Sequence, residues 1–232
     1  MASSTTPAAE PVLKLDLHAG GPGRVLGPIA LTLSPGETLA LTGPSGVGKT
    51  SLLRIIGGLD HCFSGHREAT AHIAMVFQEP LLLPWRTAVE NLTVIARISR
   101  EEAELWLEKV GLAGLGDRFP HMLSLGQQRR LSLARAFACA PELLLLDEPF
   151  VSLDPSLASD MMTLLERLIA DRPCATLLVT HVRGEADRLA GRILRMEGRP
   201  ARILEEDQNT QARFQIAVTS ETTSGSQQPT CR

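Results

Sequence analysis

The sequence predicts an α/β protein with a doubly wound core sheet, an N-terminal antiparallel β part and an inserted α-helical lobe. Three observations predict this class. Residues 143–146 and 175–180 are mostly apolar runs, as is typical of strands buried on both faces of a parallel sheet. A helix is expected between them, near 156–170, which gives the strand–helix–strand order of such a core. Short apolar runs interrupted by Gly and Pro precede the first helix and indicate antiparallel strands.

The part of the chain before the helical lobe is expected to consist of strands and loops. The runs at 12–17, 25–33 and 37–43 are predicted to form antiparallel strands ahead of the first helix. The polar segment 64–70 is predicted to be a loop, and the mostly apolar segment 71–77 is predicted to be a strand.

The helical lobe is predicted to span about 85–138. Ser99 and Glu102 have the spacing of a capping box, which marks the start of a helix. Gly111 and Gly114 are expected to end this helix. Its apolar residues recur at i, i+3, i+4 and i+7, as on one face of an amphipathic helix, and are Ala103, Trp106, Leu107 and Val110.

The end of the chain is predicted to add one further structural unit. Residues 191–204 have the pattern of a terminal hairpin. Residues 1–11 and 207–232 are small, polar or low in hydrophobicity, so both segments are expected to be flexible tails. The folded domain is therefore predicted to be 12–204.

Composition excludes several classes of function. The chain has 232 residues and a formal net charge of −3, so it has no basic excess to bind a polyanion or an anionic membrane. Aromatic residues are only 3% and tyrosine is absent, which leaves few rings on which bases could stack. The four cysteines form no CxxC pair, which is typical of reduced thiols in a cytosolic protein. The N-terminus lacks the pattern of a secretory signal. The sequence also contains no run of about 18 consecutive apolar residues, the length needed to span a bilayer.

The strongest motif is Gly-Pro-Ser-Gly-Val-Gly-Lys-Thr at 43–50, which matches GxxxxGK[ST] at each fixed position. It follows an apolar strand and precedes a predicted helix, so that backbone N–H groups and the helix N-terminus would converge on one anion. Lys49 would contact the β- and γ-phosphates of a nucleotide, and Thr50 would offer its hydroxyl to Mg²⁺. A chance glycine-rich turn is the alternative. The predicted ATP-binding residues here are Gly43, Pro44, Ser45, Gly46, Val47, Gly48, Lys49, Thr50 and Ser51.

Two carboxylates follow the apolar run at 143–146. A carboxylate at the end of a buried strand is unfavourable unless it meets a cation, which suits Asp147 to a Mg²⁺ shell. Glu148 could polarise an attacking water as a general base. A helix cap or a solvated loop is the alternative for such a pair on its own.

These segments together resemble the ATP-binding cassette (ABC) ATPases, the motor subunits of ABC transporters, over about 12–204. The other motifs that carry the resemblance are Gln78 in VFQEP, LSLGQ at 123–127, SLD at 152–154, and His181. GTPases and small-molecule kinases lack this set, and the chain has no Asn-Lys pair to begin the guanine-reading motif of a GTPase. The resemblance implies a RecA-like P-loop NTPase core that hydrolyses ATP with Mg²⁺.

The resemblance also implies roles for three single residues. Gln78 would contact Mg²⁺ and the attacking water, and His181 would contact the γ-phosphate. Asp154 would reach an opposing subunit. Taken singly, Gln78 is more commonly a surface amide and His181 a strand-end histidine with an ordinary hydrogen bond, and the joint spacing of the motifs favours the functional roles.

The segment 123–127 is predicted to open a helix, because Ser124 and Gln127 form another capping box. The resemblance implies that this helix start binds the ATP held by a partner subunit, so that two chains enclose two nucleotides. The residues implied are Ser124, Leu125, Gly126 and Gln127, together with Asp154.

Leu125 departs from the family, which prefers glycine at this position. If the position is helical, leucine keeps its amide donor and affects only steric approach. If the position needs a positive φ, leucine is strained by about 1 kcal/mol or more. We expect weakened but surviving ATPase activity.

The adenine contact is a second departure. The family stacks the base on an aromatic residue some distance before the phosphate loop, and this chain offers only His18 there. An imidazole stacks less well than a larger ring. A plain strand-edge histidine is the equal alternative.

The stretch VFQEPLLLPWRT resembles the nitrate, sulfonate and taurine branch of bacterial importers. This resemblance implies a peripheral subunit on the inner face of the cell membrane, bound to an integral permease and served indirectly by a solute-binding protein. The Gln78 loop and Trp85 would contact the permease, although Trp85 could instead lie in the core of the lobe. The transported anion does not touch this subunit, so the sequence does not name it.

Two other functions stay open at the level of sequence. One is a non-transport ABC ATPase of DNA repair or translation, although the chain lacks the long coiled coil or second cassette expected there. The other is a regulatory module that holds ATP with little turnover, as Leu125 would suggest.

Overall fold

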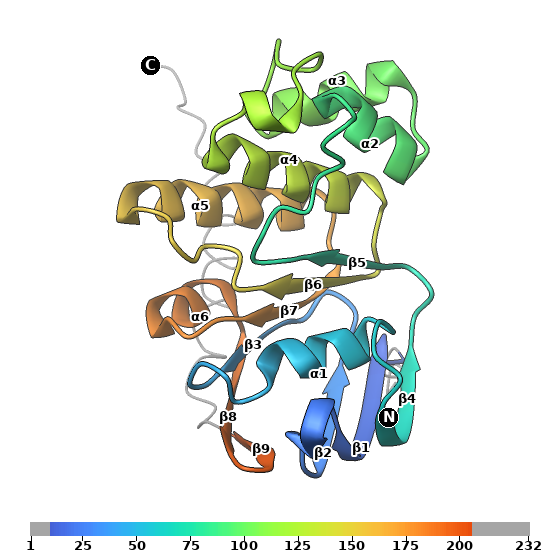
Figure 1. Cartoon of the computed structure of the whole chain (residues 1–232), viewed down its shortest axis with the longest axis vertical. Helices are drawn as coiled ribbons and strands as arrows, with labels where there is room; N and C mark the ends of the chain where they lie inside the picture. Colours follow the sequence, from blue (N-terminus) through green and yellow to red (C-terminus); the bar gives the residue numbers. More distant parts are fainter. Residues whose placement is uncertain (1–9, 206–232) are drawn as a thin grey trace, which may run out of the picture.

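The computed structural model describes residues 10–205, which form two sheets and a group of helices (Figure 1). The central sheet has the strand order β5-β6-β7-β3-β8-β9. Strands β5, β6, β7, β3 and β8 are parallel to one another, and β9 is antiparallel to β8. The α/β prediction is therefore confirmed. The strand bounds are β3 Thr38–Thr42, β5 Ile73–Val76, β6 Leu143–Asp147, β7 Ala175–Val179, β8 Arg192–Gly198 and β9 Ala201–Glu205.

The second sheet is antiparallel and contains β2 (Ile29–Leu33), β1 (Leu13–Gly20) and β4 (Phe63–Ala69) in that order. Two predictions for this region were wrong. The run 37–43 does not join this sheet but supplies β3 of the central sheet, between β7 and β8. The polar segment 64–70 is not a loop, because its backbone pairs with β1 as an edge strand whose side chains are largely exposed. Main-chain pairing places this strand, and apolar burial hardly contributes.

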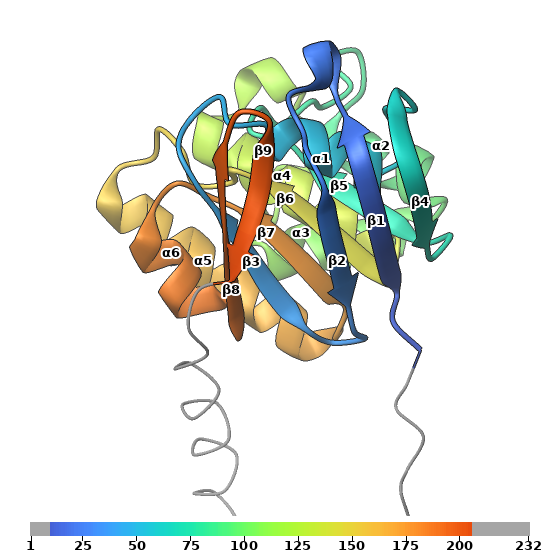
Figure 2. The ribbon, with the colours of Figure 1, turned by 90° about the horizontal axis from the view of Figure 1, so that it is seen from below.

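Helices cover both faces of the central sheet. Helix α1 (Lys49–Ile56) packs between the two sheets, and its Leu52 and Ile55 share one apolar core with β1, β2 and β3. Helices α5 (Pro155–Asp171) and α6 (Arg183–Leu189) lie on the other side of the central strands, away from the three-stranded sheet (Figure 2). The apolar strands β6 and β7 are buried on both faces, as predicted.

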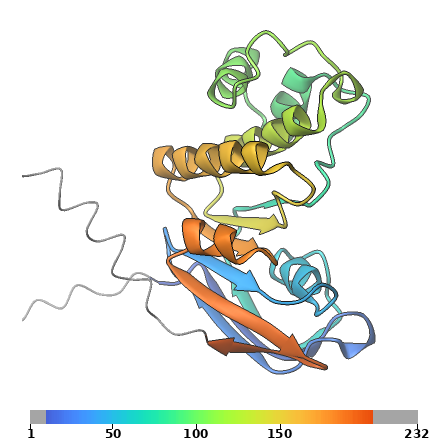
Figure 3. The same ribbon diagram turned by 90° about the vertical axis from the view of Figure 1, so that its left-hand side faces the viewer.

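The helices α2 (Ala88–Ala96), α3 (Arg100–Lys109) and α4 (Leu125–Ala138) occur between β5 and β6 in the chain. They stand at the end of the molecule opposite the three-stranded sheet (Figure 3). The predicted capping boxes at Ser99 and Ser124 are both present, and the apolar face predicted for α3 is buried. Two short 3-10 helices, η1 (Pro22–Arg24) and η2 (Pro120–Met122), complete the elements.

The predicted C-terminal hairpin is confirmed as β8 and β9. The predicted flexible tails lie outside the described residues, apart from Glu10 and Pro11. Within residues 10–205, none of the helices has both the length and the apolar character needed to cross a membrane.

Candidate active site at the carboxyl edge of the central sheet

Four neighbouring parallel strands bring most of the predicted site residues to one edge of the sheet. Val76 of β5 is level with Leu146 of β6, and Asp147 of β6 is level with Val179 of β7. Val179 is in turn level with Leu41 of β3. The segments that follow these strands contain Gln78, Glu148, His181 and the loop that begins at Gly43. Ligands of open α/β sheets bind outside this edge.

The phosphate-loop segment 43–50 joins β3 to α1, as the motif requires. Its backbone depends on glycine at two places. Gly43 has φ 146°, and a Cβ there would collide with the carbonyl oxygen of Met196. Gly48 has φ 115°, and its Cβ would lie 2.8 Å from a methyl group of Leu26. The loop is therefore pressed against β8 and the segment after η1, which fixes the direction of its amides.

Lys49 lies inside the site and does not extend to solvent. Its side chain is only 4% exposed. The ammonium donates to the carbonyl oxygens of Gly43 (2.8 Å) and Pro44 (3.1 Å) and lies 3.6 Å from Oε1 of Glu148. One positive charge thus stands between the loop and the carboxylate that follows β6.

Thr50 at the start of α1 and Asp147 at the end of β6 bring a hydroxyl and a carboxylate together. The Thr50 hydroxyl donates to Oδ1 of Asp147 at 3.1 Å. Asp147 is buried, and burial raises the pKa of its carboxyl, whereas the hydrogen bond from Thr50 lowers it. Hydroxyl and carboxylate oxygens are the ligands that Mg²⁺ accepts beside nucleotide phosphates. The residues therefore fit a magnesium ion.

Glu148 and His181 face one another across the edge. Oε2 of Glu148 lies 3.1 Å from Nδ1 of His181, and the Glu148 side chain is 17% exposed. Glu148 has φ 46°, a left-handed conformation that non-glycine residues rarely adopt. Such backbone strain of about 1–3 kcal/mol is often found where a side chain must be aimed at a reaction.

Gln78 lies in the exposed segment after β5, where no hydrogen bond fixes its side chain among the described residues. The segment itself is held by Arg135 of α4, whose guanidinium donates to the carbonyls of Pro80 (3.2 Å) and Leu81 (2.9 Å). The loop is therefore joined to the helical lobe at one end and to the sheet edge at the other.

The segment 124–127 begins α4 and stays apart from the phosphate loop. The side chains of Ser124 and Gln127 each accept a hydrogen bond from the other residue's backbone N–H, and no hydrogen bond or ion pair joins the two residues to the loop within residues 10–205. Leu125 is the first helical residue and has no positive φ, so the strained alternative does not apply. Its side chain is 47% exposed. Gly126 is buried, and a Cβ there would lie 3.0 Å from Leu157.

Asp154 caps the next helix. Its Oδ1 accepts from the backbone N–H of Leu157 at 3.0 Å, at the N-terminus of α5. Because Gly126 packs against the same Leu157, the starts of α4 and α5 lie together. No hydrogen bond or ion pair brings Asp154 to Lys49 within the described residues.

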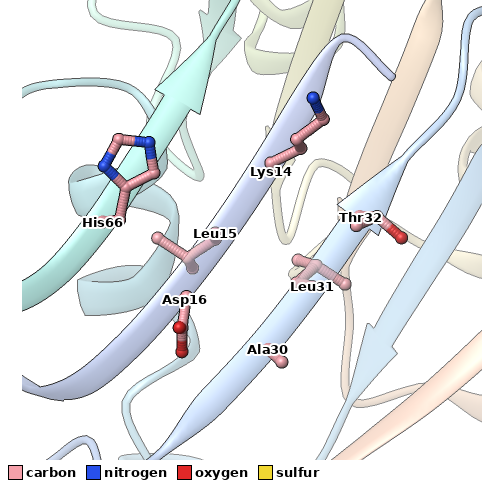
Figure 4. A pocket seen from close by; sticks show the side chains of 7 residues that line it. All are labelled: Lys14, Leu15, Asp16, Ala30, Leu31, Thr32 and His66. Carbon is pink, nitrogen blue, oxygen red and sulfur yellow. The ribbon is translucent and has the colours of Figure 1, made fainter. Parts of the chain in front are cut away.

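His18 is not brought to the phosphate loop. Its side chain is 69% exposed, and its ring nitrogen lies 3.9 Å from the carboxylate of Asp16. Lys14 and Asp16 of β1, together with His66 of β4, line a shallow pocket of about 320 Å³ on the outer face of the three-stranded sheet (Figure 4). None of the predicted site residues lines this pocket. The adenine role of His18 stays a prediction without a contact in its favour.

Val25 is a residue that the sequence analysis missed. A Cβ on Gly48 would lie 3.6 Å from a Val25 methyl group, so this side chain borders the phosphate loop. Val25 is also 37% exposed, which leaves an apolar surface beside the loop. Only the fold of the segment 21–26 places it there, and no motif in the sequence marks it.

Trp85 is exposed and therefore does not lie in the core of the lobe. It is 69% exposed, whereas the buried tryptophan of the lobe is Trp106. The loop that carries Trp85 is held by buried Asn91, whose amide donates to the carbonyls of Leu83, Arg86 and Thr87. An exposed aromatic side chain on a rigid loop is typical of a contact site.

The fold and the sheet edge together define a phosphate-loop ATPase, with a buried lysine, a threonine–aspartate pair and a glutamate at the carboxyl ends of parallel strands. A family model described as "ABC transporter" matches residues 26–151, more than half of the chain. The chain belongs to the ABC transporter family and is an ATP-binding cassette ATPase.

Several relatives and solved structures support this assignment. The aliphatic sulfonates import ATP-binding protein SsuB 1 of Rhodococcus jostii is 47% identical over 73% of this chain and 72% of its own. The protein named SsuB 2 of Paracoccus denitrificans is 43% identical over 84% of this chain and 80% of its own. A dimeric ATP-binding cassette in a post-hydrolysis state, bound to ADP and Pi, superposes with a TM-score of 0.72 at 27% identity. That superposition covers 85% of this chain and 99% of the other.

Proposed function

We propose that this chain is the ATP-hydrolysing subunit of a bacterial importer for aliphatic sulfonates or chemically similar small anions. The observation that carries the proposal is sequence identity to three proteins named as aliphatic sulfonates import ATP-binding proteins. The identity is 41–47%, and the match covers at least 72% of each of these relatives. We take residues 12–204 as the ATPase domain, with the helical lobe at about 85–138 inserted in it.

The phosphate-loop segment would bind the triphosphate of ATP. Its amides and the N-terminus of α1 supply hydrogen-bond donors, and the Lys49 ammonium moves from the loop carbonyls to the β- and γ-phosphates. Thr50, Asp147 and Gln78 would hold Mg²⁺, which neutralises the developing phosphate charge when bound.

Glu148 would act as the general base for hydrolysis. Its carboxylate would accept a proton from the attacking water. Its backbone is left-handed, and its Oε1 lies 3.6 Å from the Lys49 ammonium, beside the proposed phosphate site. His181, already in contact with Glu148, would contact the γ-phosphate. Phosphoryl transfer depends mainly on positioning and charge stabilisation, which these fixed side chains supply.

The site would be completed by a second copy of the chain. Helix α4 begins with two exposed residues, Ser124 at its N-cap and Leu125 at its first position. Asp154 lies nearby at the start of α5. In the proposed homodimer, the segment 124–127 of each chain contacts the ATP of its partner, and the sites are shared head to tail. The likeness to a dimeric cassette supports this arrangement.

The exposed loop that carries Trp85 would bind an integral membrane permease. Trp85 and Leu81 are both exposed, and Arg135 and Asn91 hold the loop rigid. The Gln78 loop joins this surface to the sheet edge, so ATP binding and permease movement can be coupled. The subunit would then lie on the cytoplasmic face of the membrane, and a solute-binding protein would deliver the anion from the other side.

The alternative of an ATP-binding module with little turnover is weakened by the position of Leu125. Because this residue is helical, its backbone N–H stays available to a partner nucleotide and only the side chain intrudes.

Uptake by cells tests the proposal. A strain that carries the gene is compared with its deletion mutant, complemented by the parent chain or by Lys49→Ala, for uptake of a labelled alkanesulfonate. We expect the deletion to abolish uptake and only the parent chain to restore it. Unchanged uptake in the deletion strain would contradict the sulfonate importer, while ATP hydrolysis by the purified chain would still identify an ATPase.

A further inference from the structure

The turn that carries His181 is closed by a side-chain contact that the hydrolysis mechanism does not use. The hydroxyl of Thr180 accepts a hydrogen bond from the backbone N–H of Val182 at 3.0 Å and donates one to Oε2 of Glu185. Thr180 and Val182 are the two neighbours of His181, so one hydroxyl joins the residues on either side of it. We call these two hydrogen bonds the Thr180–Glu185 tie.

The tie is buried, although the histidine that it encloses is not. Thr180 is 1% exposed and Glu185 is 9% exposed, whereas the His181 side chain is 42% exposed. Burial raises the pKa of the Glu185 carboxyl. The hydrogen bond from Thr180 and the charge of His181 oppose this rise, and the charge of Glu148 adds to it. A buried carboxyl is unfavourable without a partner, and the Thr180 hydroxyl is the partner that the structure provides.

Glu185 also borders the same space as the reacting groups. A cavity of about 520 Å³ between the end of β7 and α5 is lined by Glu148, His181 and Glu185, and otherwise largely by apolar side chains. Glu185 belongs to the first turn of α6, which follows β7 directly (Figure 1). The tie therefore connects the end of β7, the His181 turn and α6 at the wall of this cavity.

We propose that Glu185, acting through the Thr180 hydroxyl, is a positioning residue that holds His181 against Glu148. Without the tie, the turn between β7 and α6 would have two fewer hydrogen bonds, and the exposed imidazole would leave its 3.1 Å contact with Glu148. The phosphate-loop segment does not take part in the tie, so nucleotide binding should be preserved while hydrolysis is slowed. The inference rests on the role proposed above for His181.

The test measures steady-state hydrolysis of MgATP by the purified full-length chain. Thr180→Val removes the hydroxyl and keeps the shape, and Glu185→Leu removes the acceptor. Thr180→Ser and Glu185→Gln keep a hydroxyl and an accepting oxygen. Thr176→Val is the matched control, because Thr176 is a buried threonine of β7, the strand that ends just before Thr180, and the hydrogen bonds of its hydroxyl within residues 10–205 are local, to Cys174. Thermal melting of each variant reports folding.

We expect kcat to fall about tenfold in Thr180→Val and Glu185→Leu, with KM for ATP within about twofold of the parent. The double variant should lose no more than Thr180→Val alone, because Thr180→Val already removes both hydrogen bonds of the tie, including the one that Glu185→Leu removes. Thr180→Ser, Glu185→Gln and Thr176→Val should keep kcat within about twofold. If Glu185→Leu does not fold, the isosteric Thr180→Val still decides the result.

Parental kcat in folded Thr180→Val would overturn the inference, as would an equal loss in Thr176→Val. His181→Ala separates this failure from that of the proposed function. A low kcat in His181→Ala beside parental kcat in Thr180→Val overturns the tie alone. Parental kcat in His181→Ala overturns the role of His181 and the tie with it.

Discussion

The sheet edge and the start of α4 differ in how much of their chemistry one chain can complete. At the edge, three contacts join the start of α1, the end of β6 and the segment after β7: Thr50 to Asp147, Lys49 to Glu148, and Glu148 to His181. At the start of α4, the hydrogen bonds of the Ser124 and Gln127 side chains within residues 10–205 are those to each other's backbone. The edge is preorganised within the chain, whereas the helix start presents its donors outward. The comparison teaches that one chain positions the proposed catalytic groups by itself, and it supports the proposal that a second chain completes the site.

The largest effect is expected at the sheet edge, from Lys49→Ala. Loss of the ammonium removes the charge that meets the β- and γ-phosphates, so ATPase activity should fall by about 100-fold or more. The exposed Lys109→Ala is the matched control, and its activity should equal that of the parent. A phosphate-release assay measures the turnover of both variants. Parental turnover in Lys49→Ala would contradict the phosphate-binding role proposed for Lys49.

The next effect is expected in the lobe, from Trp85→Ala. This change should leave ATP hydrolysis by the isolated chain within about twofold of the parent, because Trp85 is 69% exposed and no hydrogen bond joins its side chain to the sheet edge within residues 10–205. Stimulation by the permease in proteoliposomes should fall about tenfold, as for the loss of a central aromatic anchor. Leu105→Ala, another exposed apolar residue of the lobe, serves as control. Full stimulation in Trp85→Ala would place the permease elsewhere.

A smaller effect should show whether Val25 or His18 lies beside the adenine base of ATP. Truncation of Val25 to Ala should raise KM for ATP about threefold, because an apolar surface beside the phosphate loop is lost. His18→Ala should leave KM unchanged, since the side-chain interaction found for His18 within residues 10–205 is with Asp16 and not with the phosphate loop. The opposite pattern in the same titration would return the adenine contact to His18.

The smallest effect is expected from Leu125→Gly. Removal of the half-exposed side chain widens the approach to the helix start, and the helical backbone is retained, so turnover should hold or rise by about twofold. Initial rates at saturating ATP measure this. A fall in turnover, with the melting temperature unchanged, would show that the leucine contributes to the site.

The sequence predicted the parts of the structure that depend on local pattern. Periodicity and capping located α3 and α4, and the apolar runs located β6 and β7. It did not predict β4, because polar side chains conceal a strand whose pairing with β1 is made by main-chain atoms. It also placed β3 in the wrong sheet, since a short apolar strand has the same pattern in parallel and antiparallel surroundings.

The candidate site shows the same division. The segment 43–50 and the pair Asp147–Glu148 were found from motifs, because their spacing is local. The Thr180–Glu185 tie and the position of Val25 depend on backbone turns that bring together side chains with no motif of their own. Register across the strands also explains why Gln78 and His181, distant in sequence, reach one edge, because they follow β5 and β7, the two strands that flank β6.

The most direct test of a site shared between two chains is ATP-dependent dimerisation of Glu148→Gln. This change preserves the side-chain shape but removes the proposed general base, so bound ATP should not be hydrolysed. Light scattering should show a dimer with ATP and a monomer with ADP, and adding Ser124→Arg at the start of α4 should restore the monomer in ATP. A Glu148→Gln chain that binds ATP and remains monomeric at high concentration would contradict the shared site.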